Sequence, residues 1–126
     1  MTTDKSKMIG KKPRPRLAVD FDGVIHRYSR GFQDGSIYDE PMPGAKAALA
    51  RLKKKWWVYI YTTRASNKAG RFAVEAWLQK HDLAFDEVVS HKPIAFAYID
   101  DRAIRFETWN QTIQELTRLD KLRKKE

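Results

Sequence analysis

Short apolar runs separated by polar stretches recur along the chain, and four of them predict β-strands. They lie at 17–19, 56–61, 88–89 and 95–99. The first run contains no polar position, which is typical of a strand that a parallel sheet buries on both faces. Residues 26–43 carry glycines, prolines and scattered aromatics without helical periodicity, so they predict a loop or a small β-flap. Residues 103–106 are a further candidate, for an edge strand.

Helical periodicity appears in three segments between and after these runs. The segments are 44–55, a second from an N-cap at Ser66 to about Lys80, and a third that begins with a capping-box pattern of Thr108 and Gln111. Their predicted apolar faces are Ala45, Ala48, Leu49 and Leu52; Ala69, Phe72, Ala73, Ala76 and Trp77; and Trp109, Ile113, Leu116 and Leu119. Strands that alternate with helices predict an α/β fold with a mostly parallel sheet.

The length and composition indicate one domain without covalent cross-links. A chain of 126 residues is long enough to bury a core of its own. Cysteine is absent, which excludes disulfides, thiolate metal sites and a cysteine nucleophile. No apolar run approaches the roughly 20 residues of a membrane span, and the basic stretch 5–16 lacks the apolar core of a secretory signal. We therefore expect a cytoplasmic protein with no membrane partner.

The net charge of +9 is concentrated at the two ends of the chain. Residues 1–16 carry +5 and residues 120–126 carry +2, which leaves +2 for everything between them. We predict a basic N-terminal arm (1–16), a folded domain (17–119) and a basic tail (120–126). Basic ends of this kind are solubilising arms or contacts for a polyanion such as nucleic acid.

Polar side chains stand where the predicted strands end. Asp20 and Asp22 close the first run, and their i, i+2 spacing places both on one side of an extended backbone. The later runs end in Thr62, in the turn that contains Lys92, and in Asp100. Because parallel strands present their carboxyl ends at one edge, we expect these groups to meet there. Carboxylates suit Mg²⁺, and a hydroxyl with a lysine suits a phosphoryl group, although each residue alone is also an ordinary turn or surface residue.

Together and in this order, the motifs resemble those of the haloacid dehalogenase (HAD) superfamily. They are Asp20-Phe21-Asp22-Gly23-Val24, the strand ending at Thr62, Lys92-Pro93, and Ile99-Asp100-Asp101. The resemblance runs from about Leu17 to Phe106 and implies a Rossmann-like three-layer sandwich. Residues 24–43 and 64–90 are too short for the cap domain of larger members, so we expect an open site without a cap.

The resemblance also implies the roles of the acidic residues. Asp20 would be the nucleophile that forms an aspartyl-phosphate, and Asp22 the general acid and base. Asp20 and Asp100, with the backbone carbonyl of Asp22, would hold Mg²⁺ as the cofactor. Thr62 and the backbone N–H of Thr63 would bind the phosphoryl group.

The remaining candidates would support that chemistry. Lys92 would neutralise charge on the nucleophile and the phosphate, and Asp101 would orient Lys92 or a metal-bound water. His26 is a candidate substrate contact that the mechanism does not require. Arg64 would either bind a second anionic group of the substrate or form a structural salt bridge.

The predicted function is that of a Mg²⁺-dependent phosphomonoester hydrolase, a phosphatase of the HAD type. The basic ends favour nucleotides or phosphorylated nucleic-acid ends as substrates. An open site admits a large substrate, or a small one if a neighbouring subunit acts as a lid, and the sequence leaves the oligomeric state open.

Two other classes of function remain. A phospho-accepting receiver domain also uses acids, Mg²⁺, a Thr and a Lys, but it has adjacent acids after its first strand and a lone aspartate in the middle. Here the spaced pair comes first and the adjacent pair last. The third candidate is a catalytically inactive module that binds nucleic acid through its basic ends.

Overall fold

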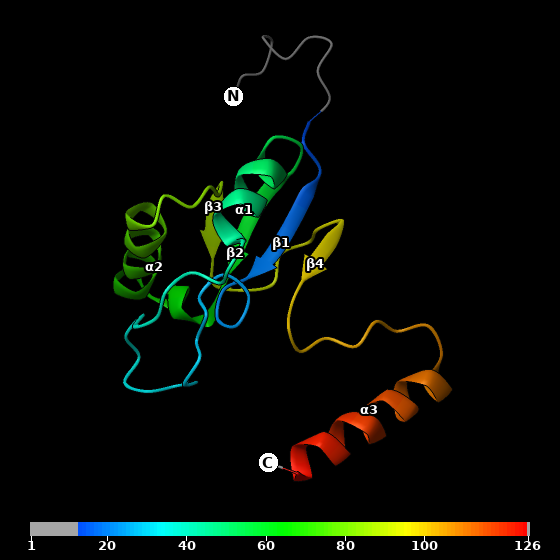
Figure 1. The fold of residues 1–126 in the computed structure, drawn as a ribbon. Coiled ribbons are helices and arrows are strands. Elements are labelled where there is room, and N and C mark those ends of the chain that lie inside the picture. Colours follow the sequence, from blue (N-terminus) through cyan, green and yellow to red (C-terminus); the bar gives the residue numbers. More distant parts are fainter. Residues whose placement is uncertain (1–12, 126) are drawn as a thin grey trace.

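A parallel β-sheet forms the centre of the protein in the computed structural model, which describes residues 13–125 (Figure 1). Its four strands have the order β3-β2-β1-β4 and all run parallel. They are β1 (Arg16–Asp20), β2 (Trp57–Tyr61), β3 (Glu87–Val89) and β4 (Ala97–Ile99). The predicted α/β class, the parallel sheet and all four strands are thus confirmed. The edge strand predicted at 103–106 is wrong, because the chain has already left the sheet there.

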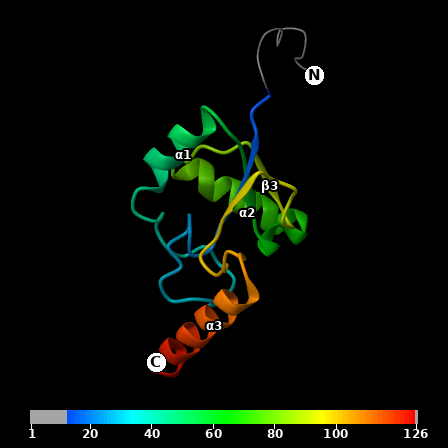
Figure 2. The ribbon, with the colours of Figure 1, turned by 90° about the vertical axis from the view of Figure 1, so that its right-hand side faces the viewer.

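Two helices cover one face of the sheet (Figures 1 and 2). They are α1 (Ala45–Lys53) and α2 (Lys68–Lys80). In the register, Leu17 pairs with Val58 and Val19 with Ile60, so the four side chains share a face. All four are buried in one cluster with Leu49, Val74, Trp77 and Leu78 from the two helices. This cluster is the hydrophobic core, and it holds the carboxyl edge of the sheet in place.

The predicted start and apolar face of α2 need correction. A short 3₁₀ helix, η2 (Thr63–Ser66), precedes it, and Asn67 rather than Ser66 is its N-cap, with a side chain that accepts a hydrogen bond from the Gly70 N–H at 2.8 Å. The buried face consists of Val74, Trp77 and Leu78, whereas Phe72 is 71% exposed. The predicted stripe and the buried one have the same helical period and share Trp77. Only the position of the sheet decides which of the two is buried.

The last helix, α3 (Trp109–Lys124), lies away from the sheet (Figures 1 and 2). Its predicted cap is confirmed, since Thr108 Oγ1 accepts a hydrogen bond from the Gln111 N–H at 3.2 Å. The apolar stripe lies along one side of the helix but is exposed. Within residues 13–125, no helix covers the second face of the sheet. In the described part of the chain the third layer of the predicted sandwich is therefore not formed, because α3 does not fold back onto the strands.

The ends of the predicted domain also differ in detail. Most of the predicted basic arm (1–16) lies outside the described residues, but Arg16 begins β1 and Arg14 forms a bidentate ion pair with the buried Asp86 at 3.0 and 3.2 Å. The predicted tail continues α3 as far as Lys124. Residues 26–43 form the expected loop, in which His26 makes isolated bridges to Asp22 and to Pro41. None of the helices within residues 13–125 is long and apolar enough to cross a membrane.

Candidate functional site

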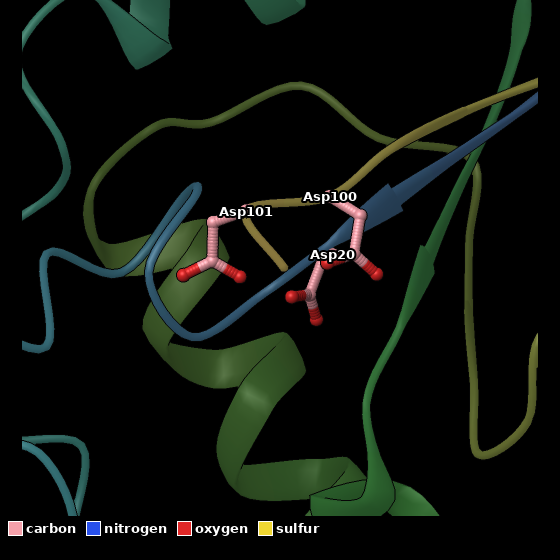
Figure 3. Close-up of side chains that lie close together, drawn as sticks. All are labelled: Asp20, Asp100 and Asp101. Carbon is pink, nitrogen blue, oxygen red and sulfur yellow. The ribbon is translucent and has the colours of Figure 1, made fainter. Parts of the chain in front are cut away.

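Three carboxylates meet at the carboxyl edge of the sheet. Asp20 is the last residue of β1, and Asp100 and Asp101 directly follow the neighbouring strand β4. One oxygen from each lies within 4.8 Å of the others, and Figure 3 shows the three side chains gathered beside the end of β1. The expected meeting of Asp20 and Asp100 is present, whereas the side chain of Asp22, which was expected to join them, is not part of this group. Asp101, which the sequence placed behind the metal ligands, belongs to the same cluster.

We call Asp20, Asp100 and Asp101 the acid cluster. The pKa of Asp20 in this cluster is strongly raised. Its side chain is half-buried, and Oδ1 accepts a hydrogen bond from the Phe21 N–H at 2.8 Å. The pKa of Asp20 is raised to about 6, mainly by burial; the Phe21 hydrogen bond lowers it, and the charges of Asp100, Asp101 and Asp22 add to the rise. A bound cation would relieve the repulsion between carboxylates that lie this close together.

Asp100 is held by two donors. Its Oδ2 accepts a hydrogen bond from the Tyr61 hydroxyl at 2.6 Å, and its Oδ1 accepts one from the Arg102 N–H at 2.8 Å. These bonds, helped by the charge of Lys92, lower the pKa of Asp100. Burial and the bond to Asp100 raise the pKa of Tyr61, which keeps the hydroxyl a donor. Sequence reasoning missed Tyr61, although its place at the end of β2, paired with Asp20, was a usable signal.

Gly23 provides the space that Asp101 occupies. Its φ of 89° lies in the left-handed region, and a β-carbon at this position would collide with the Asp101 carboxylate. A larger residue here would have to displace the Asp101 carboxylate and adopt a strained backbone conformation. The glycine that follows the two aspartates of the first motif thus has a direct part in assembling the acid cluster.

Asp22 faces a different set of partners. Its Oδ1 lies 2.8 Å from His26 Nδ1, and its Oδ2 accepts a hydrogen bond from Arg64 Nε at 2.9 Å. His26 is fully buried, and its Nε2 accepts the Asp39 N–H at 3.1 Å, so Nδ1 carries the proton that it donates to Asp22. Both His26 nitrogens are thus used within the protein. Arg64 forms the structural salt bridge that was one of its two predicted roles.

The predicted phosphate-binding residues lie near the same edge. Thr62 follows β2 and is buried, and its Oγ1 accepts the Arg64 N–H at 3.2 Å. Thr63 is exposed. Lys92 is also exposed, with its ammonium 4.5 Å from the centre of the Tyr98 ring. The structure therefore places Lys92 within electrostatic reach of the acid cluster but stacked on an aromatic side chain.

A cleft of about 340 Å³ opens between the 26–43 loop and the start of α2. Its walls are Asp22, Tyr28, Phe32, Gly35, Ser36, Ile37, Thr63, Arg64, Gly70 and Ala73. Asp22 follows Asp20 of the acid cluster by two residues and Thr63 lies just after the end of β2, while the loop contributes aromatic and aliphatic side chains. The cleft thus offers one charged end and one apolar wall beside the carboxylates.

Comparisons of the chain with family models, curated proteins and solved structures found no match. The resemblance to the HAD superfamily therefore stays a prediction from the motifs. Function has to be inferred from the residues of this chain and from their geometry.

Proposed function

We propose that the protein is a Mg²⁺-dependent phosphomonoester hydrolase in which Asp20 is the nucleophile. The observation that carries this proposal is the acid cluster, in which three carboxylates from two neighbouring strand ends lie within 4.8 Å of one another. The residues fit a hard divalent cation, because they offer oxygen donors only and bring together like charges that burial makes costly. Mg²⁺ is the natural choice for a site that also receives a phosphate.

Asp20 and Asp100 would hold the metal, with the Asp22 backbone carbonyl and the Asp101 carboxylate beside them. When bound, Mg²⁺ offsets the repulsion between an anionic nucleophile and an anionic substrate. The hydroxyl of Tyr61 keeps one oxygen of Asp100 in position. The Phe21 N–H does the same for one oxygen of Asp20, and we assign the other oxygen to attack.

The reaction proceeds in two displacements at phosphorus. The Asp20 oxygen attacks, the bond from phosphorus to the ester oxygen breaks, and Asp22 donates a proton to the departing alcohol. Asp22 then takes a proton from a water that attacks the aspartyl-phosphate, which releases inorganic phosphate and restores Asp20. To reach the ester oxygen, the Asp22 carboxylate exchanges its contact with Arg64, which leaves that guanidinium available to the substrate.

The phosphoryl group would be bound by the end of β2 and by Lys92. The Thr62 hydroxyl and the Thr63 N–H donate to its oxygens, and the Lys92 ammonium leaves the Tyr98 ring to pair with it. The cleft beside Asp22 would take the alcohol part of the substrate. Its volume and its aromatic wall suit a nucleoside, which agrees with the preference for nucleotides or nucleic-acid ends that the basic chain ends suggest.

Steady-state phosphate release tests the proposal. The full chain is assayed with Mg²⁺ against nucleotides, sugar phosphates and end-phosphorylated oligonucleotides. Asp20→Asn should lower turnover at least about 1000-fold because the nucleophile is lost. Asp82→Asn is the matched control, because the Asp82 side chain is 85% exposed and outside the site, and it should keep full activity.

Three outcomes would contradict the proposal. Wild-type turnover by Asp20→Asn removes the nucleophile assignment. A stable phosphorylated chain without phosphate release favours a receiver domain. Oligonucleotide binding without hydrolysis of any substrate, lost on deletion of residues 1–12, favours a binding module; this deletion retains Arg14, whose ion pair with Asp86 belongs to the fold.

A further inference from the structure

Two large apolar surfaces of the chain are exposed. The first, the α3 stripe, lies along one side of the last helix and is 38–70% exposed at every position. It consists of Trp109, Ile113, Leu116 and Leu119. A continuous stripe of this kind is typical of a helix that packs against a partner surface.

The second surface, the sheet patch, comprises side chains of β2 and β4 on the uncovered face of the sheet and side chains of the segment that leads into β4. It consists of Trp57, Ile94, Phe96 and Tyr98, which are 36–85% exposed. In the register, Trp57 pairs with Arg16 and Tyr98 with Ala18, so both point away from the core face that carries Leu17. This is the face on which the third layer of an α/β sandwich would pack.

The α3 stripe and the sheet patch match in size. With aromatic side chains of roughly 150–250 Å² and somewhat smaller aliphatic ones, the two surfaces each expose roughly 450 Å². If both surfaces of two copies were covered, about 1,800 Å² would be buried, which lies within the range of stable protein interfaces. A helix of 16 residues is about 24 Å long, enough to cross the four-stranded sheet.

The path of the chain directs α3 away from its own patch. After β4, the Asp100 carboxylate accepts the Arg102 N–H, and Asp101 packs against Gly23, so the connection leaves from the carboxyl edge. Figure 1 shows α3 beyond that edge. Phe96, by contrast, directly precedes the amino end of β4. The helix and its complementary surface therefore lie toward opposite ends of the strands.

We infer that the protein forms a two-fold dimer in which α3 of each copy packs on the sheet patch of the other. This exchange completes both sheets with a second helical layer and leaves neither the α3 stripe nor the sheet patch open for further copies. A two-fold arrangement satisfies both surfaces at once, since each copy donates one helix and receives one.

The molar mass in solution is the first test. Light scattering coupled to size exclusion should give twice the chain mass for the wild type over a range of concentrations. Leu116→Glu in the α3 stripe and Phe96→Glu in the sheet patch should each halve that mass, with circular dichroism unchanged. Phe72→Glu is the matched control, because Phe72 is equally exposed but on α2, and it should remain dimeric. A monomeric wild type overturns the inference.

Cross-linking identifies which copy supplies the helix. Because the chain contains no cysteine, only the introduced cysteines can react. Chains with Leu116→Cys are refolded together with tagged chains carrying Phe96→Cys and treated with a flexible bismaleimide. A covalent heterodimer is expected, and the same mixture with Phe72→Cys in place of Phe96→Cys should give none. If a chain carrying both Leu116→Cys and Phe96→Cys instead closes on itself as a monomer, α3 covers its own sheet and the inference fails.

Discussion

Replacing Asp20 by Asn should make the protein more stable while it makes the proposed enzyme inactive. Asn keeps the shape of the side chain and still accepts the Phe21 hydrogen bond, but it removes the charge that the acid cluster makes costly. The pKa of Asp20 rises from 3.8 to about 6 on folding, mainly through burial. At about 1.4 kcal/mol per pKa unit, reduced by roughly half because the carboxyl group is only half-buried and solvent screens its charge, the ionised carboxylate opposes folding by about 1.5 kcal/mol.

The sign of the effect follows from proton linkage. Below pH 3.8 the Asp20 carboxyl is protonated in both the folded and the unfolded chain, so its ionisation does not reduce the stability of the fold. As the pH rises towards 6 the unfolded chain releases this proton before the folded one does, so stability is lost across this window. The gain from Asp20→Asn should therefore be small near pH 4 and largest above about pH 6.5.

Thermal and urea denaturation of the wild type and Asp20→Asn, in chelator across this pH window, measure the effect. For a chain of this size a gain of about 1.5 kcal/mol raises Tm by roughly 5 °C. Glu107→Gln is the control, because it removes one exposed carboxylate outside the cluster, and it should leave the stability almost unchanged. Added Mg²⁺ should stabilise the wild type more than the variant, which narrows the difference. A variant no more stable than wild type at neutral pH, or equally stabilised at acid pH, would refute the reasoning.

Three further substitutions test the surrounding structure. Gly23→Ala should displace Asp101 and weaken Mg²⁺ binding at least tenfold by calorimetry, with the helix content retained, because a β-carbon collides with that carboxylate. Tyr61→Phe removes the donor that lowers the pKa of its carboxylate partner, so the onset of Mg²⁺ binding should shift to higher pH in a titration series. Arg14→Ala leaves Asp86 buried without its bidentate partner and should cost about 3 kcal/mol in urea denaturation; a cost below about 1 kcal/mol would mean that water replaces the guanidinium.

Most of the candidate site could be predicted because its elements lie at strand ends. Asp20 closes an apolar run and Asp100 closes another, and a parallel sheet brings such ends to one edge whatever the sequence between them. The partners of Asp22 could not be predicted in the same way. Its contacts with His26 and Arg64 depend on how the 26–43 loop folds over the start of α2, and no local pattern encodes that fold.

The sequence by itself determined the strands, the parallel α/β class and the cap at Thr108, since periodicity and capping depend on residues close together in the chain. Only the tertiary structure decided which stripe of α2 is buried, that Asp101 joins the acid cluster, and that α3 stands away from the sheet. These features depend on distances between segments far apart in sequence. Such distances are set by packing of the whole chain, so they cannot be predicted from patterns among residues that are neighbours in the sequence.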